Sequence, residues 1–255
     1  MTKKEKIMLE AGSIMADIKA QMIEAIKPGV SSMDIEDLVT RLIRKNKCKV
    51  SFSTVSGYDF ATCINLNSGM VHGIPRKDII FKPGDVVTVD TGLLLHHHHV
   101  DNAVTVQLDP KDEKTTRFLD TGKQALKAAI KQARPGNSIY DISLALESTI
   151  ESAGYSVSRD LTGHGIGKEL HETPNIPCYT DSAYKEIKIT PNQTLAIEIM
   201  YAMGDSKLKI DEDGWKYSTV DGSLSGMFEE TVFIGQDKTT PVTAIDPQLK
   251  NYLKQ

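Results

Sequence analysis

The sequence is poor in cysteine and in long apolar runs. Its 255 residues include three cysteines, Cys48, Cys63 and Cys178, an odd number without CxxC spacing. This argues against a disulfide framework and predicts reduced thiols in a cytoplasmic protein. No apolar run approaches the ~18 residues of a membrane span, and the N-terminus lacks the apolar core of a signal peptide.

The sequence also lacks a strong excess of charge. The formal net charge is −4, so no basic footprint for nucleic acid is present and none is expected to bind. Hydrophobic residues make up 40% of the chain and charged residues 25%, which is typical of a globular protein. A chain of this length fits one large domain or two small ones.

Hydrophobic periodicity predicts four helices and a set of strands. Apolar residues recur at helical spacing in residues 3–26, 34–44, 111–133 and 138–153. Strands are predicted for two segments within 49–71 joined through 56–59, and for 85–90, 100–106, 155–159, 194–198 and 226–233. Asp213-Gly214-Trp215 predicts a hairpin turn.

An internal repeat divides the chain into two halves. Pro28-Gly29-x-Ser31-x-x-Asp34-Ile35 matches Pro135-Gly136-x-Ser138-x-x-Asp141-Ile142 at an offset of 107, and the strand ending at Asp90 matches the strand ending at Glu198 at an offset of 108. Because Pro-Gly helix stops are common, one match would be weak; two at nearly one offset indicate duplication. We therefore predict an α+β domain with two pseudo-symmetric halves around a shared antiparallel sheet, and a site where the halves meet.

Four carboxylates lie in apolar strands. Asp90, Asp101, Glu198 and Glu229 have no matching strand lysine or arginine, and a buried carboxylate is costly unless it is paired or bound to metal. One such residue is often a satisfied structural partner, but that does not explain four. Asp90 and Asp101 are expected to lie opposite each other in a hairpin that turns near residues 95–97, with Cβ atoms ~5 Å apart.

His164, between two glycines, adds a nitrogen to this set. Four carboxylates and one imidazole provide mostly oxygen ligands and a charge that two divalent ions ~3.5–4 Å apart would balance. Such ligands suit Mn, Fe, Co or Zn, and the lack of thiolate argues against a structural zinc site. His72 and His171 lie in Gly- and Pro-containing segments and are candidates for substrate contact.

These segments, taken in order, resemble one family. The set Val71-His72-Gly73-Ile74-Pro75, Asp90-x10-Asp101, Gly163-His164-Gly165-Ile166-Gly167-x3-His171-Glu172-x-Pro174, Ile197-Glu198 and Phe228-Glu229-x-Thr231 is similar to the type I methionine aminopeptidases of the pita-bread metallopeptidase superfamily. The resemblance runs from about residue 6 to residue 233. It implies a duplicated pseudo-two-fold fold, with a curved antiparallel sheet backed by helices.

The resemblance also implies roles for individual residues. Asp90, Asp101, His164, Glu198 and Glu229 match the family's ligands for two divalent ions, and His72 and His171 match its substrate-contacting histidines. The residues near the positions that line its methionine pocket are Tyr58, Phe60, Cys63, Leu170 and Trp215.

The activity so implied is removal of the initiator methionine from nascent polypeptides. A hydroxide bridging two metals would attack the peptide bond, with Glu198 as general base. A metal and His171 would stabilise the oxyanion, while His72 would position a peptide with a small second residue. We expect one catalytic domain over 1–255 with a short helical N-terminus and no extra N-terminal domain. It is expected to be a cytoplasmic monomer without membrane contact, and any ribosome contact is expected to be transient.

Several residues depart from the family pattern. His97 stands where the family usually has glycine, in a run of four histidines, His96 to His99, that we interpret as an exposed turn of altered geometry without a native role. Ile199 replaces a proline, and Met227 stands where a polar residue is common. Glu230 replaces a histidine and is expected to face away from Glu229.

Two alternative functions remain open from the sequence. An Xaa-Pro peptidase of the same superfamily usually carries an additional N-terminal domain, for which this chain has no room. A non-catalytic binding module with the same fold typically loses metal ligands, whereas all five matched positions are intact here.

Overall fold

The computed structural model describes residues 1–245; the remainder of the domain predicted for 1–255, residues 246–255, lies outside the described residues. The four predicted helices are confirmed to within three residues at each end. They are α1 (Lys3–Ala25), α2 (Ser32–Lys45), α3 (Glu113–Gln132) and α4 (Ile139–Ser152). In the part of the chain that the structure describes, no helix combines the length and the hydropathy needed to span a membrane.

The repeat predicted from the sequence is a repeat in structure. Helices α2 and α4 begin with the same cap, in which the carboxylate of Asp34 or Asp141 accepts a hydrogen bond from the backbone N–H of Ser31 (2.9 Å) or Ser138 (2.7 Å). Each capping serine also forms an isolated antiparallel bridge, Ser31 to Ile80 and Ser138 to Lys188. Equivalent residues therefore fix each half in the same way.

The strands form one large antiparallel sheet and one small one. The ten-stranded sheet has the order β1-β4-β5-β12-β9-β7-β8, with β2 paired to β4, β6 to β9 and β13 to β12, and the small sheet has the order β10-β11-β3. Their bounds are β1 Lys49–Val50, β2 Thr62–Leu66, β3 Gly69–Val71, β4 Val86–Leu95, β5 His98–Gln107, β6 Ser156–Val157, β7 Thr162–Gly165, β8 Glu172–Pro177, β9 Thr194–Ala202, β10 Leu208–Ile210, β11 Tyr217–Thr219, β12 Ser225–Ile234 and β13 Thr239–Pro241. Strand β12 of the second half pairs with β5 of the first half, so the halves join in the middle of the sheet.

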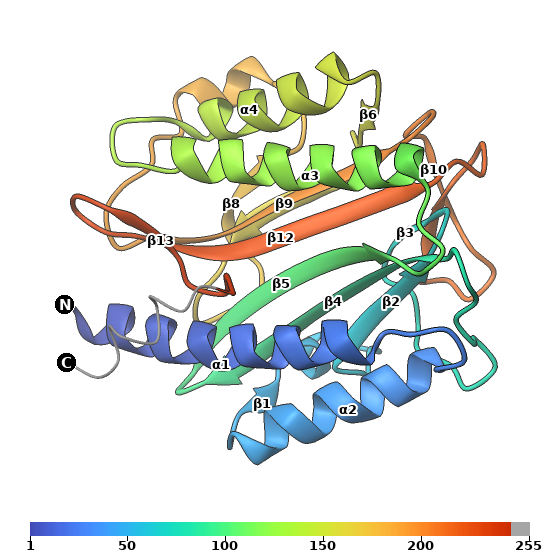
Figure 1. The fold of residues 1–255 in the computed structure, drawn as a ribbon. Helices are drawn as coiled ribbons and strands as arrows, with labels where there is room; N and C mark the ends of the chain where they lie inside the picture. The colour runs from blue at the N-terminus through green and yellow to red at the C-terminus, as the bar shows by residue number, and fades with distance from the viewer. Residues whose placement is uncertain (246–255) are drawn as a thin grey trace.

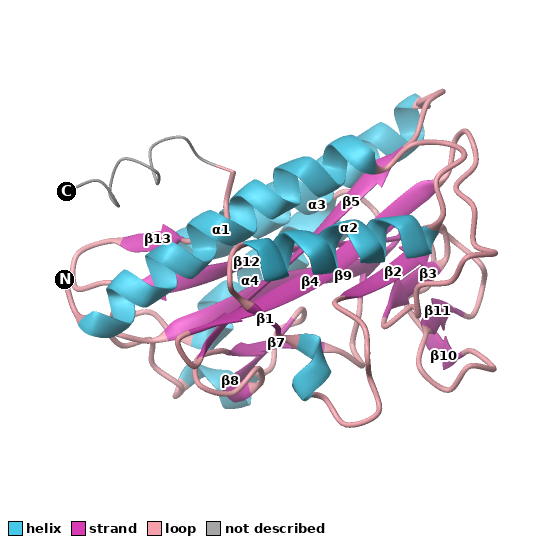
Figure 2. Cartoon of the chain, turned by 90° about the horizontal axis from the view of Figure 1, so that it is seen from below, coloured by secondary structure: helices cyan, strands magenta, loops and turns pink. Residues whose placement is uncertain are grey.

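The helices of both halves pack on one face of the sheet (Figure 1). Helix α1 lies along β4 and β5, while α3 lies along β9 and β12. Figure 2 shows α1 and α2 covering the strands of their own half. Two hydrophobic clusters fill these interfaces, one under α1 and α2 and one under α3 and α4. The predicted duplicated α+β architecture is confirmed. The opposite face of the sheet is not covered by these four helices.

Some predicted strands differ from the observed ones. Strands β4 and β9 continue past their carboxylates to Leu95 and Ala202, so Asp90 and Glu198 lie within strands and not at their ends. Residues 49–71 form three short strands and a 3-10 turn at Phe52–Thr54, not two strands. Strand β8 was not predicted, since two prolines in a polar segment are unusual for a strand, but it lies at the sheet edge, where proline is tolerated.

The β4–β5 hairpin differs from the prediction in its register. Its two-residue turn is His96–His97, and both residues have positive φ, 47° and 62°, as a type I′ turn requires. The turn therefore lies about one residue later than expected, which moves the register by two. Asp90 is opposite Ala103 and Asp101 is opposite Gly92, so the aspartates share a face as diagonal neighbours and are not opposed.

Candidate metal centre

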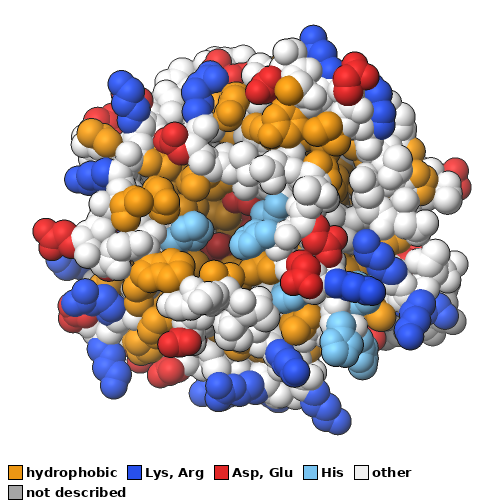
Figure 3. All heavy atoms as spheres, turned by 180° about the vertical axis from the view of Figure 1, so that it is seen from behind, with side chains coloured by type: hydrophobic (Ala, Val, Ile, Leu, Met, Phe, Trp, Pro, Cys, Tyr) orange, Lys and Arg blue, Asp and Glu red, His pale blue; other side chains and the backbone are white. Residues whose placement is uncertain are grey.

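A cavity of about 410 Å³ opens on the face of the sheet opposite the helices. In Figure 3 it is a hollow bordered by histidine and apolar side chains, with acidic atoms at its bottom. All seven residues predicted to bind metal or contact substrate through histidine line this cavity: Asp90, Asp101, His164, Glu198, Glu229, His72 and His171. The structure thus brings together residues separated by more than 150 positions in the chain.

The two glutamates face each other across the junction of β9 and β12. Glu198 and Glu229 are direct register partners, and both side chains are buried. Burial raises the pKa of each well above its ordinary value, and nearby carboxylates, above all Asp101, raise the pKa further. Like charges directly opposite each other destabilise a sheet, so the pair is tolerable only when protonated or neutralised by cations.

The two aspartates add to the same problem. Asp90 is buried, and desolvation together with the charges of Asp101 and Glu198 raises its pKa well above the usual range. Burial raises the pKa of Asp101 to about 7. No lysine or arginine lines the cavity within residues 1–245. The four carboxyls therefore lack a protein counter-charge.

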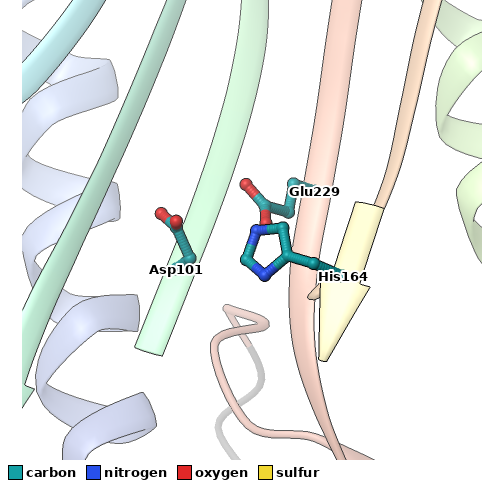
Figure 4. Close-up of side chains that lie close together, drawn as sticks. All are labelled: Asp101, His164 and Glu229. Carbon is teal, nitrogen blue, oxygen red and sulfur yellow. The ribbon is translucent and has the colours of Figure 1, made fainter. Parts of the chain in front are cut away.

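His164 is held so that one ring nitrogen faces the carboxylates. Its Nδ1 lies 2.8 Å from the Gly165 carbonyl oxygen, which can only accept, so Nδ1 carries the hydrogen. Burial lowers its pKa to about 4, so the ring is neutral and Nε2 keeps its lone pair. That nitrogen lies 3.9 Å from Glu198 Oε1. Figure 4 shows the ring beside Glu229, with Asp101 extending from the neighbouring strand β5.

These side chains fit a divalent metal. One potential ligand atom each from Asp101, His164 and Glu229 lies within 4.8 Å of the others. Among the described residues, Asp90 Oδ1 and Glu229 Oε1 are buried oxygens without a hydrogen-bond donor. An acceptor-only atom buried without a partner is costly, and a cation removes that cost. Carboxylate oxygens and one oriented imidazole suit a hard or borderline divalent ion.

The other two histidines stand at the opening of the cavity. The His171 ring packs edge-on against His164, with centroids 4.5 Å apart. His72 packs against Tyr217 at 5.7 Å and has a positive φ of 60°. Such a backbone conformation is uncommon outside glycine and clusters at functional sites. Burial lowers the pKa of both rings, so both are neutral at pH 7.

An apolar wall adjoins the carboxylates. Of the predicted methionine-pocket residues, Tyr58, Cys63, Leu170 and Trp215 line the cavity. Phe60 is not among the lining residues; it packs edge-on against Tyr58 at 5.8 Å, one layer behind the wall, and its contact with a methionine side chain stays a prediction. Trp215 lies at 5.1 Å from the same ring. Sequence reasoning missed further lining residues, among them Phe52, Val55, Met200 and Met227.

The histidine run is only partly the exposed turn that we expected. His96 and His97 are exposed, but His99 is buried, and its Nδ1 lies 2.6 Å from Ser51 Oγ. The His99 N–H also donates to the Gly167 carbonyl (2.7 Å), which ties the hairpin to the segment carrying His164 and His171. Alternation along the strand was the available signal, since His99 lies two residues before Asp101.

Comparison with known proteins gives the same assignment. The model of metallopeptidase family M24 matches residues 6–236. Methionine aminopeptidase 1 of Bacillus subtilis is 34% identical over 228 residues, covering 89% of this chain and 91% of the relative.

Solved structures agree in fold. The crystal structure of methionine aminopeptidase from Thermotoga maritima superposes with a TM-score of 0.92 at 36% identity, covering 96% of this chain and 98% of that one. The prolidase from Pyrococcus horikoshii, at 21% identity, a TM-score of 0.73 and coverage of 98% of this chain and 64% of its own, shares the pita-bread fold alone. The chain belongs to metallopeptidase family M24 and, within that family, to the methionine aminopeptidases.

Proposed function

We propose that this protein hydrolyses the first peptide bond of polypeptides that begin with methionine, with two divalent ions held by Asp90, Asp101, His164, Glu198 and Glu229. The single observation that carries this proposal is the buried cluster of four carboxyls and one neutral imidazole at the bottom of an apolar cavity. Five ligands for one ion would leave an excess of negative charge, and two ions balance it.

Bound ions would lower the pKa of coordinated water and polarise the substrate carbonyl. The chain itself supplies the proton movements. Glu198, 3.9 Å from His164 Nε2, is placed to accept the proton of the attacking water at its carboxylate and return it to the leaving amine. His171, neutral at the cavity opening, donates a hydrogen bond to the oxyanion. His72, which also lines the cavity, positions the peptide substrate.

The cavity favours methionine on chemical grounds. A thioether side chain is flexible and polarisable, and packs well against aromatic rings. Tyr58 and Trp215 present such rings, with Leu170 completing the apolar wall. Binding the side chain there would place the first peptide bond near the carboxylates. We further propose a preference for small second residues, as the resemblance to the methionine aminopeptidases implies.

The proposal includes its setting. Nascent polypeptide N-termini are the substrates, and the protein works as a cytoplasmic monomer whose contact with the ribosome, if made, uses the surface of this domain. Three cysteines, all buried and free, are consistent with a reducing compartment. Neither the Xaa-Pro peptidase nor the binding-module alternative gains a specific observation in its favour.

The direct test is release of methionine from Met-Ala-Ser by purified protein loaded with Mn, Co or Fe, with an Xaa-Pro dipeptide as the comparison substrate. We expect metal-dependent hydrolysis of Met-Ala-Ser and no hydrolysis of the Xaa-Pro dipeptide. Glu198→Gln should abolish turnover while the protein stays folded, since it removes the proton acceptor but keeps the side chain's size. Absence of methionine release with every metal would sink the proposal, and preferential cleavage of the Xaa-Pro substrate would replace it with the alternative.

A further inference from the structure

The junction of the two halves is held by an unusual pattern of hydrogen bonds. Strands β5 and β12 pair as a backbone ladder at only two positions, Glu229 with Ala103 and Glu230 with Asn102. On either side of this short ladder, a threonine hydroxyl on one strand hydrogen-bonds to the backbone of the other strand. The Thr231 hydroxyl bridges to Asp101, and the Thr105 hydroxyl bridges to Met227.

Each hydroxyl replaces a pair of backbone hydrogen bonds. Thr231 Oγ1 accepts from the Asp101 N–H (2.8 Å) and donates to the Asp101 carbonyl (2.8 Å). Thr105 Oγ1 accepts from the Met227 N–H (2.9 Å) and donates to the Met227 carbonyl (2.7 Å). An inserted side-chain oxygen separates the strands more than a direct ladder does, so the two bridges allow β5 and β12 to diverge without leaving backbone groups unpaired.

The two bridges make the same contacts across the β5–β12 junction, but they bind different residues, and the Thr105 hydroxyl also lies 2.9 Å from the Thr88 hydroxyl. Thr231 holds the backbone of Asp101, a ligand candidate, whereas Thr105 holds Met227, which is not one. Thr231 and Thr105 are both buried. The Thr231 backbone is also held in place, because its N–H donates to Thr243 Oγ1 (3.0 Å). The Thr243 hydroxyl in turn donates to the Glu230 carboxylate.

We propose that Thr231 is a positioning residue of the metal centre: its hydroxyl fixes the Asp101 backbone so that this carboxylate faces Glu229 and His164 before metal binds. The inference rests on the proposed function, since it takes Asp101 as a ligand. Residues that orient metal ligands typically contribute a factor of about 10–100 to metal affinity. The Asn102 N–H, 2.9 Å from Oδ1, also orients the Asp101 carboxylate.

The test uses the two bridges as a matched pair. Thr231→Val and Thr105→Val each replace a buried hydroxyl by a methyl group and leave an N–H and a carbonyl without a partner. Thr105→Val also removes the hydrogen bond between the Thr105 and Thr88 hydroxyls (2.9 Å), so it should lower the melting temperature of the metal-free protein at least as much as Thr231→Val does. Mn²⁺ affinity, measured by isothermal titration calorimetry on the intact chain, should fall about 10–100-fold in Thr231→Val. It should stay within about threefold of wild type in Thr105→Val and in Thr231→Ser, which keeps the hydroxyl. At saturating Mn²⁺, Thr231→Val should recover most of its kcat on Met-Ala-Ser.

The outcomes separate the inference from the function on which it rests. Equal Mn²⁺ affinities in Thr231→Val and Thr105→Val, with wild type binding Mn²⁺, would overturn the positioning role and leave the proposed function standing. A wild-type protein that binds no Mn²⁺ would overturn the function itself. If Thr231→Val does not fold, the smaller Thr231→Ala replaces it, and wild-type affinity in that variant would equally count against the inference.

Discussion

Two histidines in edge-on contact have different environments, and this difference separates their roles. His164 is buried, and its Nδ1 is committed to the Gly165 carbonyl, so only Nε2 is free to bind an ion. His171 is exposed at the opening of the same cavity, 4.5 Å away between ring centroids. A neutral ring at that place can donate one hydrogen bond toward a substrate oxygen.

His171→Ala should therefore lower kcat on Met-Ala-Ser by about 10²–10³, since removing one donor to an oxyanion has an effect of this size. KM and Mn²⁺ affinity should change little, because His171 is not among the ligand candidates. Steady-state kinetics measures kcat and KM, and isothermal titration calorimetry measures the Mn²⁺ affinity. A variant with normal kcat would remove the oxyanion role, and one that loses metal would make His171 a ligand.

Residue types were predictable from the sequence, whereas some of their contacts were not. Strand carboxylates without basic partners stand out in any sequence, so the ligand candidates could be named. Burial of His99 depends on Ser51 and Gly167, which come from distant loops. The position of Phe60 behind Tyr58, and not in the cavity, likewise depends on which way a short irregular segment turns.

At the scale of elements, a largely buried ion pair joins helix α1 to the central strand β12. Lys19 Nζ lies 2.7 Å from Glu230 Oε1, and the two side chains are 5% and 16% exposed. Glu230 lies on the face of β12 opposite Glu229, as predicted from strand alternation. Because its other oxygen accepts from Thr243, Glu230 joins α1, β12 and the turn after β13.

Lys19→Met should destabilise the protein by about 2–4 kcal/mol, somewhat below the loss for a fully buried pair, because Glu230 keeps one hydrogen bond and some solvent contact. The double variant Lys19→Met, Glu230→Met should recover at least half of that loss, since two apolar side chains leave no unpaired charge. Urea denaturation at pH 7 measures both. If the loss of stability in the double variant equals the sum of the losses in Lys19→Met and in Glu230→Met, the two side chains do not act as a pair.

Register was the element property that the sequence could least determine. Two strands and a turn between Asp90 and Asp101 were predictable, but a shift of the turn by one residue changes which residues face each other by two. The turn at His96–His97 has positive φ at two non-glycine residues, which residue type alone does not favour. The β5–β12 junction pairs strands from the two halves, and no local pattern predicts its hydroxyl bridges.

At the scale of the whole molecule, the duplicated fold brings four carboxyl groups, two from each half, into the buried interior. The four buried carboxyls have raised pKa values, so the folded metal-free protein holds protons that the unfolded chain releases above about pH 4. Their contribution to the free energy of unfolding is fully present below that pH and is lost as pH rises through the folded pKa values, which are about 7 for Asp101 and well above the ordinary value for the others.

The buried histidines act in the opposite direction at lower pH. Burial lowers their folded pKa values, to about 4 for His99 and His164, so their contribution is present above the unfolded value of about 6.5 and is lost as pH falls. Between about pH 4 and 6.5 the two groups oppose each other. Above about pH 6.5 the folded histidines are neutral and those of the unfolded chain lose their remaining charge by about pH 7.5. This adds only about 0.4 kcal/mol of stability per histidine, so the carboxyls dominate the slope.

Metal-free protein should therefore lose stability between pH 6.5 and 8, by about 2 kcal/mol for each carboxyl proton that the fold still holds across this window. Saturating Mn²⁺ should reverse the slope, because ligands must be deprotonated to bind and metal affinity rises with pH. Urea denaturation at both pH values, with chelator and with Mn²⁺, measures the effect. Glu229→Gln is the matched control: it removes one of the protons and should reduce the slope of the metal-free protein. A metal-free protein that is equally stable at both pH values would mean that the folded chain ionises its four carboxyls without help, and the argument that cations are needed to neutralise them would then be wrong.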